Sequence, residues 1–162
     1  MSDLGVRPFV PTDAPALTEI LNAIIAAGGT TAYEVPFTPD GLRAAHLDGP
    51  TVICCHTVLL GCEPVGFQVL NTNTKLPDNW GDIASFTRRD PPVRGAGTAL
   101  FTATLARAKA LGLSALNATI RADNTAGLGY YSKIGFEDRR RIAGAPLKDG
   151  TCIDRVQKTY PL

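Results

Sequence analysis

Apolar residues follow a helical spacing near the start of the chain. One amphipathic helix is predicted from five apolar residues that share a single helical face: Leu17, Ile20, Leu21, Ile24 and Ile25. Thr12 or Asp13 can cap the start of this helix, and the pair Gly28–Gly29 ends it. A second, shorter helix is predicted over residues 38–47, with Thr38 as its N-cap.

Alternating or continuous apolar runs predict seven strands, at residues 5–10, 51–60, 63–72, 81–89, 114–121, 137–144 and 151–160. The run 51–60 is apolar on both faces, as in a central strand, whereas 114–121 alternates and so has two unlike faces. Two more helices are predicted. One follows a Gly-rich turn at 94–99 and ends at Gly112, and the other lies within 124–135.

The order of these elements defines the fold class. It is strand, two helices, three strands, helix, strand, helix and two strands, which is an α/β fold with a mixed sheet. The helix after the Gly-rich turn connects the fourth and fifth strands, so these strands should run parallel through a right-handed crossover. At 162 residues the chain is long enough to bury one core. We therefore expect a single domain over residues 4–162.

Composition and charge narrow the function classes. A hydrophobic fraction of 44% and a charged fraction of 19% describe an ordinary globular protein. The net charge of +1 argues against a nucleic-acid-binding surface. No apolar run approaches the ~20 residues of a membrane span, and the first ten residues lack the pattern of a signal peptide. The sequence therefore predicts a cytoplasmic protein.

The cysteines and histidines do not follow a metal-binding pattern. Cys54 and Cys55 are adjacent, no C-x-x-C pair exists, and neither His46 nor His56 completes a zinc-like spacing. We expect neither a metal nor a disulfide. Packing roles are the expected ones for the cysteines and for His56.

The turn before the third long helix has the pattern R-G-x-G-x-A, formed by Arg94, Gly95, Gly97 and Ala99. A P-loop would need a lysine after the glycines, and the dinucleotide fingerprint would need a glycine in place of Leu100. The unpaired N–H groups at a helix start attract a pyrophosphate. Small residues would let it approach, and the arginine adds charge. A plain turn is the alternative, because glycines are common in turns.

Two motifs at the right separation resemble the GNAT superfamily of N-acetyltransferases. R-x-x-G-x-A resembles the acetyl-CoA pyrophosphate loop of that family. The second motif, "NTAGLGYYSKIGFE", has Asn124, Tyr131 and Lys133 at the places of the second family signature. The order of elements also resembles that family over nearly the whole chain. The segments "TEILNAIIAAGGTTAYEVPFT" and "PLKDGTCIDRV" are similar to the phosphinothricin-type amino-acid acetyltransferases.

The resemblance implies that acetyl-CoA is the donor substrate, and that the fourth and fifth strands splay apart to admit it. It implies that the pantetheine arm lies along the fourth strand, and that Asn124 helps to hold the cofactor on the other side. The residues implied in cofactor binding are Phe86, Thr87, Arg88, Arg94, Gly95, Ala96, Gly97, Thr98, Ala99, Asn124 and Tyr131.

The resemblance also assigns a catalytic role to Tyr131, which would protonate the departing thiolate. This role is chemically reasonable, because a phenol with a pKa of ~10 is protonated at neutral pH and a thiol has a pKa of ~8.5. The neighbouring Tyr130 is expected to pack only. Glu34 and Asp82 are the two candidate bases that could deprotonate the acceptor through water, and either could equally be a surface carboxylate. Tyr33 and Glu34 lie in a loop that often forms a wall of the acceptor pocket in this family.

Two function classes follow from these observations. The favoured one is an enzyme that transfers an acetyl group directly to a primary amine of a small molecule, such as an amino acid or analogue. Other outcomes are a non-catalytic acyl-CoA-binding module, or acetylation of a protein N-terminus or tRNA. The intact Tyr131 favours the enzyme, because a module that only binds needs no acid for a thiolate. A homodimer is left open.

Overall fold

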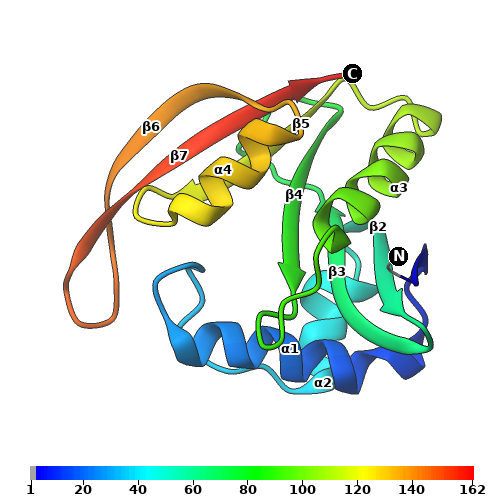
Figure 1. Cartoon of the computed structure of the whole chain (residues 1–162). Helices are drawn as coiled ribbons and strands as arrows, with labels where there is room; N and C mark the ends of the chain where they lie inside the picture. The colour runs from blue at the N-terminus through cyan, green and yellow to red at the C-terminus, as the bar shows by residue number, and fades with distance from the viewer. Residues whose placement is uncertain (1–2) are drawn as a thin grey trace.

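The computed structural model describes residues 3–162 and contains one sheet of seven strands (Figure 1). The strands are β1 (Leu4–Pro8), β2 (Val52–Leu60), β3 (Glu63–Asn71), β4 (Trp80–Thr87), β5 (Ala115–Arg121), β6 (Glu137–Pro146) and β7 (Cys152–Pro161). Their order in the sheet is β1-β2-β3-β4-β5-β7-β6. Only β4 and β5 pair in parallel, and every other neighbouring pair is antiparallel. The predicted α/β fold with a mixed sheet is confirmed.

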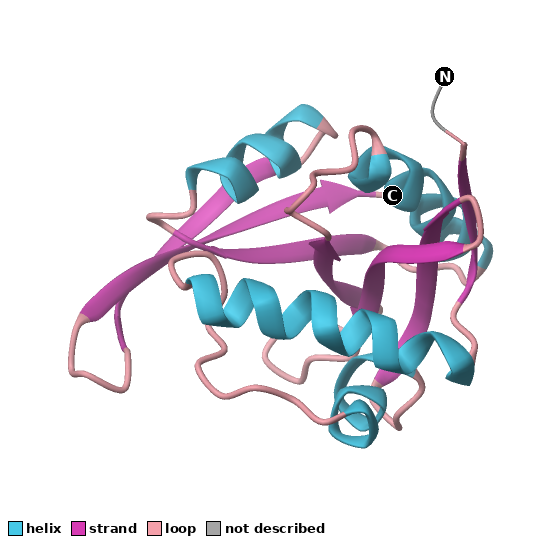
Figure 2. Cartoon of the chain, turned by 60° about the horizontal axis from the view of Figure 1, so that its bottom comes forward, coloured by secondary structure: helices cyan, strands magenta, loops and turns pink. Residues whose placement is uncertain are grey.

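Helices cover both faces of the sheet (Figure 2). They are α1 (Ala14–Ala27), α2 (Pro39–Leu42), the π-helical turn η2 (Arg43–Leu47), α3 (Ala96–Ala110) and α4 (Thr125–Lys133). On one face, Leu17 and Leu21 of α1 are buried against Phe67 and Val69 of β3. On the other, α3 and α4 pack on β5 and its neighbours, and the strands β6 and β7 form a long hairpin beyond them.

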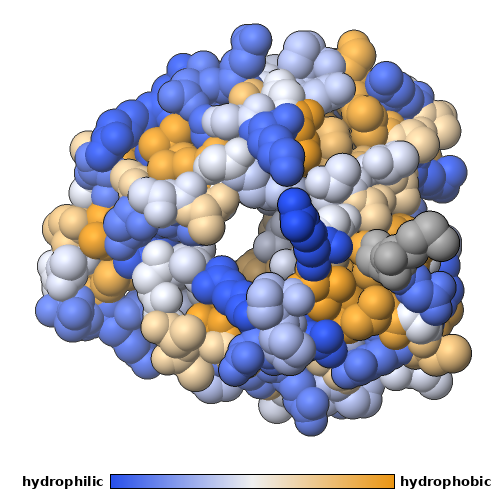
Figure 3. Space-filling model, in the orientation of Figure 1, coloured by the Kyte–Doolittle hydropathy of each residue, from blue (hydrophilic) through white to orange (hydrophobic). Residues whose placement is uncertain are grey.

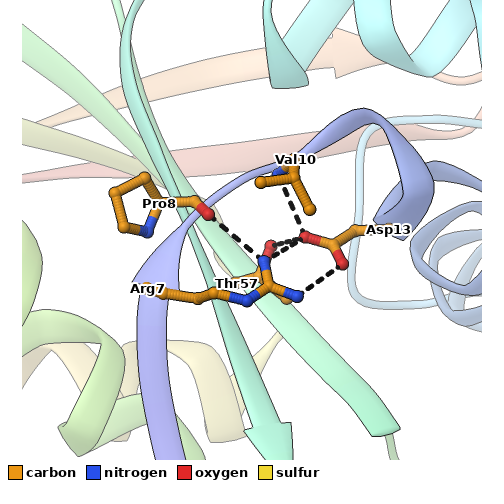
Figure 4. A network of polar contacts seen from close by, with 5 residues as sticks. All are labelled: Arg7, Pro8, Val10, Asp13 and Thr57. Carbon is orange, nitrogen blue, oxygen red and sulfur yellow. Dashed lines mark hydrogen bonds and ion pairs between the residues drawn. The ribbon is translucent and has the colours of Figure 1, made fainter. Parts of the chain in front are cut away.

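Asp13, one of the two predicted caps, is the N-cap residue of α1, but its side chain makes no capping hydrogen bond to that helix. Its buried carboxylate instead accepts hydrogen bonds from the Arg7 guanidinium (2.7 and 2.9 Å), the Val10 N–H (3.1 Å) and the Thr57 hydroxyl (2.9 Å), as Figure 4 shows. These contacts join β1, the turn before α1, and β2. The predicted cap of the second helix is confirmed, because Thr38 Oγ1 accepts from the Gly41 N–H at 3.1 Å.

Replacing Asp13 with alanine is expected to lower the free energy of unfolding by roughly 1–3 kcal/mol at pH 7, because buried donors lose their acceptor. Burial alone would raise the pKa of Asp13, but the bonds from Arg7, Val10 and Thr57 hold it below its usual value. This stabilisation is therefore present above the unfolded-state pKa of about 4 and is lost as the pH falls below it. Urea unfolding at pH 7 and pH 3 measures both effects.

The matched control for this measurement is Asp48→Ala. Asp48 pairs with Arg43 at 2.7 Å, but both side chains are more than a third exposed. Its removal should cost less than about 1 kcal/mol. Equal losses for the two variants at pH 7 would contradict a stabilising role for the buried network.

The sheet opens between β4 and β5. Residues Trp80–Ile83 pair with Ala115–Ala118, and the parallel pairing stops there. The second half of β4 has β3 as its only neighbouring strand, while the end of β5 pairs with β7 alone. The predicted splaying of these two parallel strands is confirmed, and it leaves a free edge of β4 in the middle of the molecule.

The cysteines are all unpaired thiols. Burial raises the pKa of Cys54 to about 11, which keeps this thiol protonated at neutral pH. Over residues 3–162, no group of three or more His, Cys, Asp or Glu side chains could hold a metal ion. No helix in the same range is both long and apolar enough to cross a membrane.

Candidate active site

A cavity of about 690 Å³ lies where β4 and β5 separate. It is lined from both faces of the sheet, by the loop after α1 on one side and by α4 and the start of α3 on the other. Figure 3 shows an opening near the centre of the molecule, bordered by hydrophilic, intermediate and hydrophobic residues. Two molecules that enter from opposite faces could therefore meet beside the free edge of β4.

The start of α3 presents free N–H groups. Gly95 is the N-cap and has a φ of +84°, a left-handed conformation that glycine adopts without steric cost. The N–H of Ala96 donates to the Val93 carbonyl, and that of Ala99 closes the first turn on Gly95. Helix geometry leaves the N–H groups of Gly97 and Thr98 without an intrahelical acceptor. This end of α3 can therefore bind an anion.

Gly97 has a second reason to lack a side chain. A Cβ placed on Gly97 would lie 2.7 Å from Cε1 of the Tyr130 ring, which is too close. The Tyr130 hydroxyl donates to the Gly97 carbonyl at 2.7 Å, so the ring is held in this place. The expectation that Tyr130 only packs is incomplete: Tyr130 also lines the cavity and ties α4 to α3.

The free edge of β4 exposes backbone groups of alternate residues. The Arg88 N–H donates to Val65 of β3 at 2.8 Å, and the pairing register continues without a shift along β4. Because backbone groups alternate in direction along a strand, Phe86 points its N–H and C=O to β3 as well. Those of Ser85 and Thr87 point to the gap. Among the predicted residues 86–88, Thr87 therefore offers its backbone to a ligand in the gap.

The side chains of the predicted residues 86–88 are also divided between the cavity and the surface. Phe86 and Thr87 line the cavity, and so does Arg89, which the sequence did not single out. Arg88 is not part of the lining, because its side chain pairs with Glu63 at 3.2 Å. Of the Gly-rich turn, Gly97 lines the cavity, and Arg94 is exposed in the loop that leads to it.

A chain of hydrogen bonds leads from the Gly97 carbonyl to the Tyr131 hydroxyl. The Gly97 carbonyl can only accept, so Tyr130 donates to it and must itself accept from Gln68 Nε2, at 3.0 Å. The same amide nitrogen donates to Ser85 Oγ at 2.8 Å. Ser85 Oγ lies 2.9 Å from Tyr131 Oη, and either oxygen can be the donor. With Ser85 as the donor, the hydrogen of Tyr131 is free to point into the cavity.

The environment of Tyr131 keeps its hydroxyl protonated. The residue is buried, and burial is the main cause that raises the pKa of Tyr131 above its ordinary value. The hydrogen bond from Ser85 acts in the opposite direction, and Tyr130 and Asp82 raise the pKa further. A protonated donor beside the free edge of β4 suits the role of a general acid.

Asn124 positions the helix that carries Tyr131. Its side chain caps α4 by accepting from the Gly127 N–H at 2.9 Å, and it donates to the Thr30 carbonyl at 3.1 Å. The loop after α1 is thereby fastened to the start of α4. Asn124 lines the cavity, and its role in holding a cofactor stays a prediction.

Polar side chains gather in the half of the cavity that faces α1. Asp82 accepts from Asn117 at 2.9 Å and from Asn73 at 3.0 Å. Tyr33 is hydrogen-bonded to the buried His46. Burial raises the pKa of Tyr33, and the charge of Asp82 raises it further. Asp82, Tyr33 and His46 all line the cavity.

Two arginines lie at the end of β5 and opposite it on β7. Arg121 and Arg155 are direct cross-strand partners, and both line the cavity. Arg121 pairs with Asp123 at 2.8 Å. Within residues 3–162, Arg155 has no ion pair and no side-chain hydrogen bond. Like charges opposite each other in a sheet are unfavourable, so this corner can attract an anion.

Glu34 does not belong to this group. It is exposed, and both of its carboxylate oxygens accept from the Lys148 N–H at 3.0 Å. It lies outside the cavity lining and fastens the β6–β7 turn to the loop after α1. Of the two predicted bases, the structure brings only Asp82 to Tyr131's cavity. Sequence reasoning missed His46, Ser85 and Arg155, and of these only Ser85 had a signal, its place beside residues 86–88.

Comparisons with known proteins agree with this geometry. The profile of the Acetyltransferase (GNAT) family matches residues 18–136. No curated protein sequence matches the chain. The fold is that of many solved acetyltransferases.

A GNAT-superfamily phosphinothricin acetyltransferase from Sinorhizobium meliloti in complex with acetyl-CoA is 21% identical, with a TM-score of 0.84 over 99% of this chain and 89% of that one. An N-acetyltransferase from Staphylococcus aureus Mu50 is 18% identical, with a TM-score of 0.84 over 99% of both chains. A ribosomal-protein-alanine N-acetyltransferase from Brucella melitensis is 17% identical, with a TM-score of 0.85 over 98% of this chain and 99% of that one.

Proposed function

The chain belongs to the GNAT family of acetyltransferases, and we propose that it moves the acetyl group of acetyl-CoA to the primary amine of an α-amino acid or a close analogue. The family makes it an acetyl-CoA-dependent N-acetyltransferase. One observation carries the proposal on the acceptor: the cavity crosses the sheet, and its α1 side holds an anion, Asp82, and an unpaired cation, Arg155. One domain over residues 4–162 contains the whole site.

Acetyl-CoA would occupy the side of the cavity formed by α3, α4 and the free edge of β4. The free N–H groups of Gly97 and Thr98 would bind the pyrophosphate, with Arg94 beside them. The backbone of Ser85 and Thr87 would pair with the pantetheine arm, because no strand pairs with them on that side. This arrangement would place the thioester near the hydroxyl groups of Ser85 and Tyr131.

Direct attack of the amine would form the new C–N bond and break the C–S bond. The sulfur would leave as a thiolate and take its proton from Tyr131. Ser85 would donate to Tyr131 Oη and so direct the hydrogen of Tyr131 toward the sulfur. No cysteine lines the cavity, so the site offers no thiol for a covalent acetyl-enzyme.

The acceptor would lie between Asp82 and the arginine pair. Asp82 would attract the ammonium group, and Arg155 would bind the carboxylate. Asp82 is the pairing partner of Asn117 on β5, and Arg155 is the pairing partner of Arg121, four residues further along β5. The backbones of Asp82 and Arg155 are therefore about 13 Å apart along the strand direction. The long arginine side chain can span part of this distance. An amino acid would thus fit with its amine toward Asp82.

Replacing Arg155 with glutamine is expected to lower kcat/KM for an amino acid about 10–100-fold, because a charge-assisted hydrogen bond is worth roughly 1.5–3 kcal/mol. Most of this fall in kcat/KM should come from a higher KM for the amino acid. For the same amine without its carboxylate, the variant and the wild type should differ by less than about threefold. Thiol release from acetyl-CoA with paired acceptors measures this difference.

Arg141→Gln is the matched control, since Arg141 lies on the same β6–β7 hairpin but is exposed and paired with Asp154. It should behave as the wild type with both acceptors. A uniform effect of Arg155→Gln on acceptors with and without a carboxylate would overturn the carboxylate site. A peptide N-terminus that is acetylated much faster than any free amino acid would overturn the small acceptor.

A further inference from the structure

His46 is a buried histidine in the acceptor half of the cavity. It comes from η2, and its ring lies against Tyr33 (centroids 5.5 Å apart) and against Phe86 of β4 (6.4 Å). Its Nε2 is hydrogen-bonded to Tyr33 Oη, and Asn71 Nδ2 of β3 lies 3.0 Å from its Nδ1. A titratable ring is thus held at both nitrogens, next to the place where the acceptor ammonium would lie.

We propose that His46 is the proton acceptor of the reaction and that the Tyr33 hydroxyl relays the proton to it. The inference rests on the acetyl transfer proposed above. One proton passes from the ammonium to Tyr33 Oη while the hydrogen of Tyr33 passes to His46 Nε2. The freed lone pair of nitrogen attacks the thioester carbon, and the C–S bond breaks.

Two further protons move in the reaction, the hydroxyl proton of Tyr131 and the second proton of the amine. The sulfur takes the proton of Tyr131. The nitrogen loses its second proton as the amide forms, and this proton returns Tyr131 to its neutral state. His46 gives its proton to solvent, so each turnover releases one proton. No other reactant is needed.

Asn71 allows His46 to change its protonation state. In the structure, Asn71 Nδ2 faces His46 Nδ1 and Asn71 Oδ1 accepts from the Thr51 hydroxyl at 3.3 Å. A half-turn of the amide would bring its oxygen to the ring, where it would accept from Nδ1–H and leave the lone pair of Nε2 for the Tyr33 hydroxyl, and the proposal uses this orientation. A hydroxyl can donate or accept, so either orientation of the amide keeps its bonds.

The charges around His46 favour this role over Asp82. Asp82 faces the site from β4, but each of its two carboxylate oxygens already accepts from an asparagine amide, Oδ1 from Asn117 and Oδ2 from Asn73. Tyr33 faces His46 from the loop after α1. On the histidine's own segment, Arg43 and Asp48 pair with each other at the surface. Burial lowers the pKa of His46, so the ring is uncharged and able to accept a proton at neutral pH.

The test is the pH dependence of kcat/KM for His46→Gln, for Tyr33→Phe and for the wild type, on one amino acid acceptor. At pH 7 each variant is expected to lose about 10²–10⁴-fold. The loss should shrink as the pH rises past the pKa of the acceptor amine, because free amine then needs no base. Tyr33→Phe keeps the ring that packs on Phe37, so it tests the relay without removing bulk.

The chain offers a matched control in its other histidine. His56 is also buried, but it lies on β2 outside this cavity, so His56→Gln should keep the wild-type profile. If His46→Gln and Tyr33→Phe keep wild-type rates at pH 7, the relay is wrong while the acetyl transfer stands. A loss in these variants that is equal at every pH would mean that they only shape the pocket, and would also overturn the proposal. If the wild type acetylates no amine, the proposed function itself fails.

Discussion

Replacing Tyr131 with phenylalanine is expected to lower kcat by about 10²–10⁴-fold and to leave acetyl-CoA affinity almost unchanged. The ring contacts with Tyr130 and Phe136 survive the change, but the donor to the thiolate is lost. That donor acts mainly where charge develops on sulfur, so its loss affects the transition state more than the bound ground state. Steady-state thiol release and calorimetry measure the two quantities.

Two further measurements separate this role from a packing role. The loss should shrink with an acyl donor whose thiol has a lower pKa, because such a thiolate leaves without help. Ser85→Ala should lower kcat less than Tyr131→Phe does, since it removes the hydroxyl that orients Tyr131 and keeps the Tyr131 hydroxyl itself. Weaker CoA binding with turnover intact would show instead that Tyr131 is only a cofactor contact.

Replacing Gly97 with valine is expected to weaken acetyl-CoA binding by well over tenfold, which is more than about 1.4 kcal/mol. The new Cβ would lie 2.7 Å from the Tyr130 ring, and the branched side chain would also occupy the space before the free N–H groups of α3. The Tyr130 ring, which is held by its bond to the Gly97 carbonyl, must therefore shift. Calorimetric titration of the folded variant with acetyl-CoA measures the loss.

Gly129→Ala is the control for this prediction, because Gly129 lies in α4 and a Cβ there meets nothing within 4 Å. Its acetyl-CoA affinity should match the wild type. A second change, Tyr130→Ser in the Gly97→Val background, relieves the clash with the ring. If affinity then returns fully, Gly97 serves Tyr130 alone. If CoA affinity is unchanged in Gly97→Val, the pyrophosphate does not bind at this turn.

Much of the fold could be predicted from local patterns. The alternation in 114–121 and the continuous apolar run in 51–60 located β5 and β2, because burial on one or two faces controls the residue types in a strand. The turn at Gly95 could be predicted for a local reason as well, since the φ of +84° at this residue is a requirement of the turn itself. The hydrogen-bond network of Asp13 could not be predicted locally, because its partners Arg7 and Thr57 come from two different strands.

The acceptor half of the site could not be predicted in the same way. His46 is one residue in a short helical segment, and its role depends on contacts with Tyr33 and Asn71, which lie 13 and 25 residues away. Arg155 stands out only because the pairing of β5 with β7 places it beside Arg121. Glu34 had a favourable position in the sequence, but the turn between β6 and β7 takes both of its oxygens.

The most direct test of the central claim is thiol release from acetyl-CoA by the wild-type protein, with and without a panel of amino acids, followed by mass spectrometry of the acceptor. The account predicts that release depends on the acceptor, that the acceptor gains one acetyl group at its amine, and that no cysteine is acetylated. Tight binding of acetyl-CoA without acceptor-dependent release for any amine in the panel would contradict it.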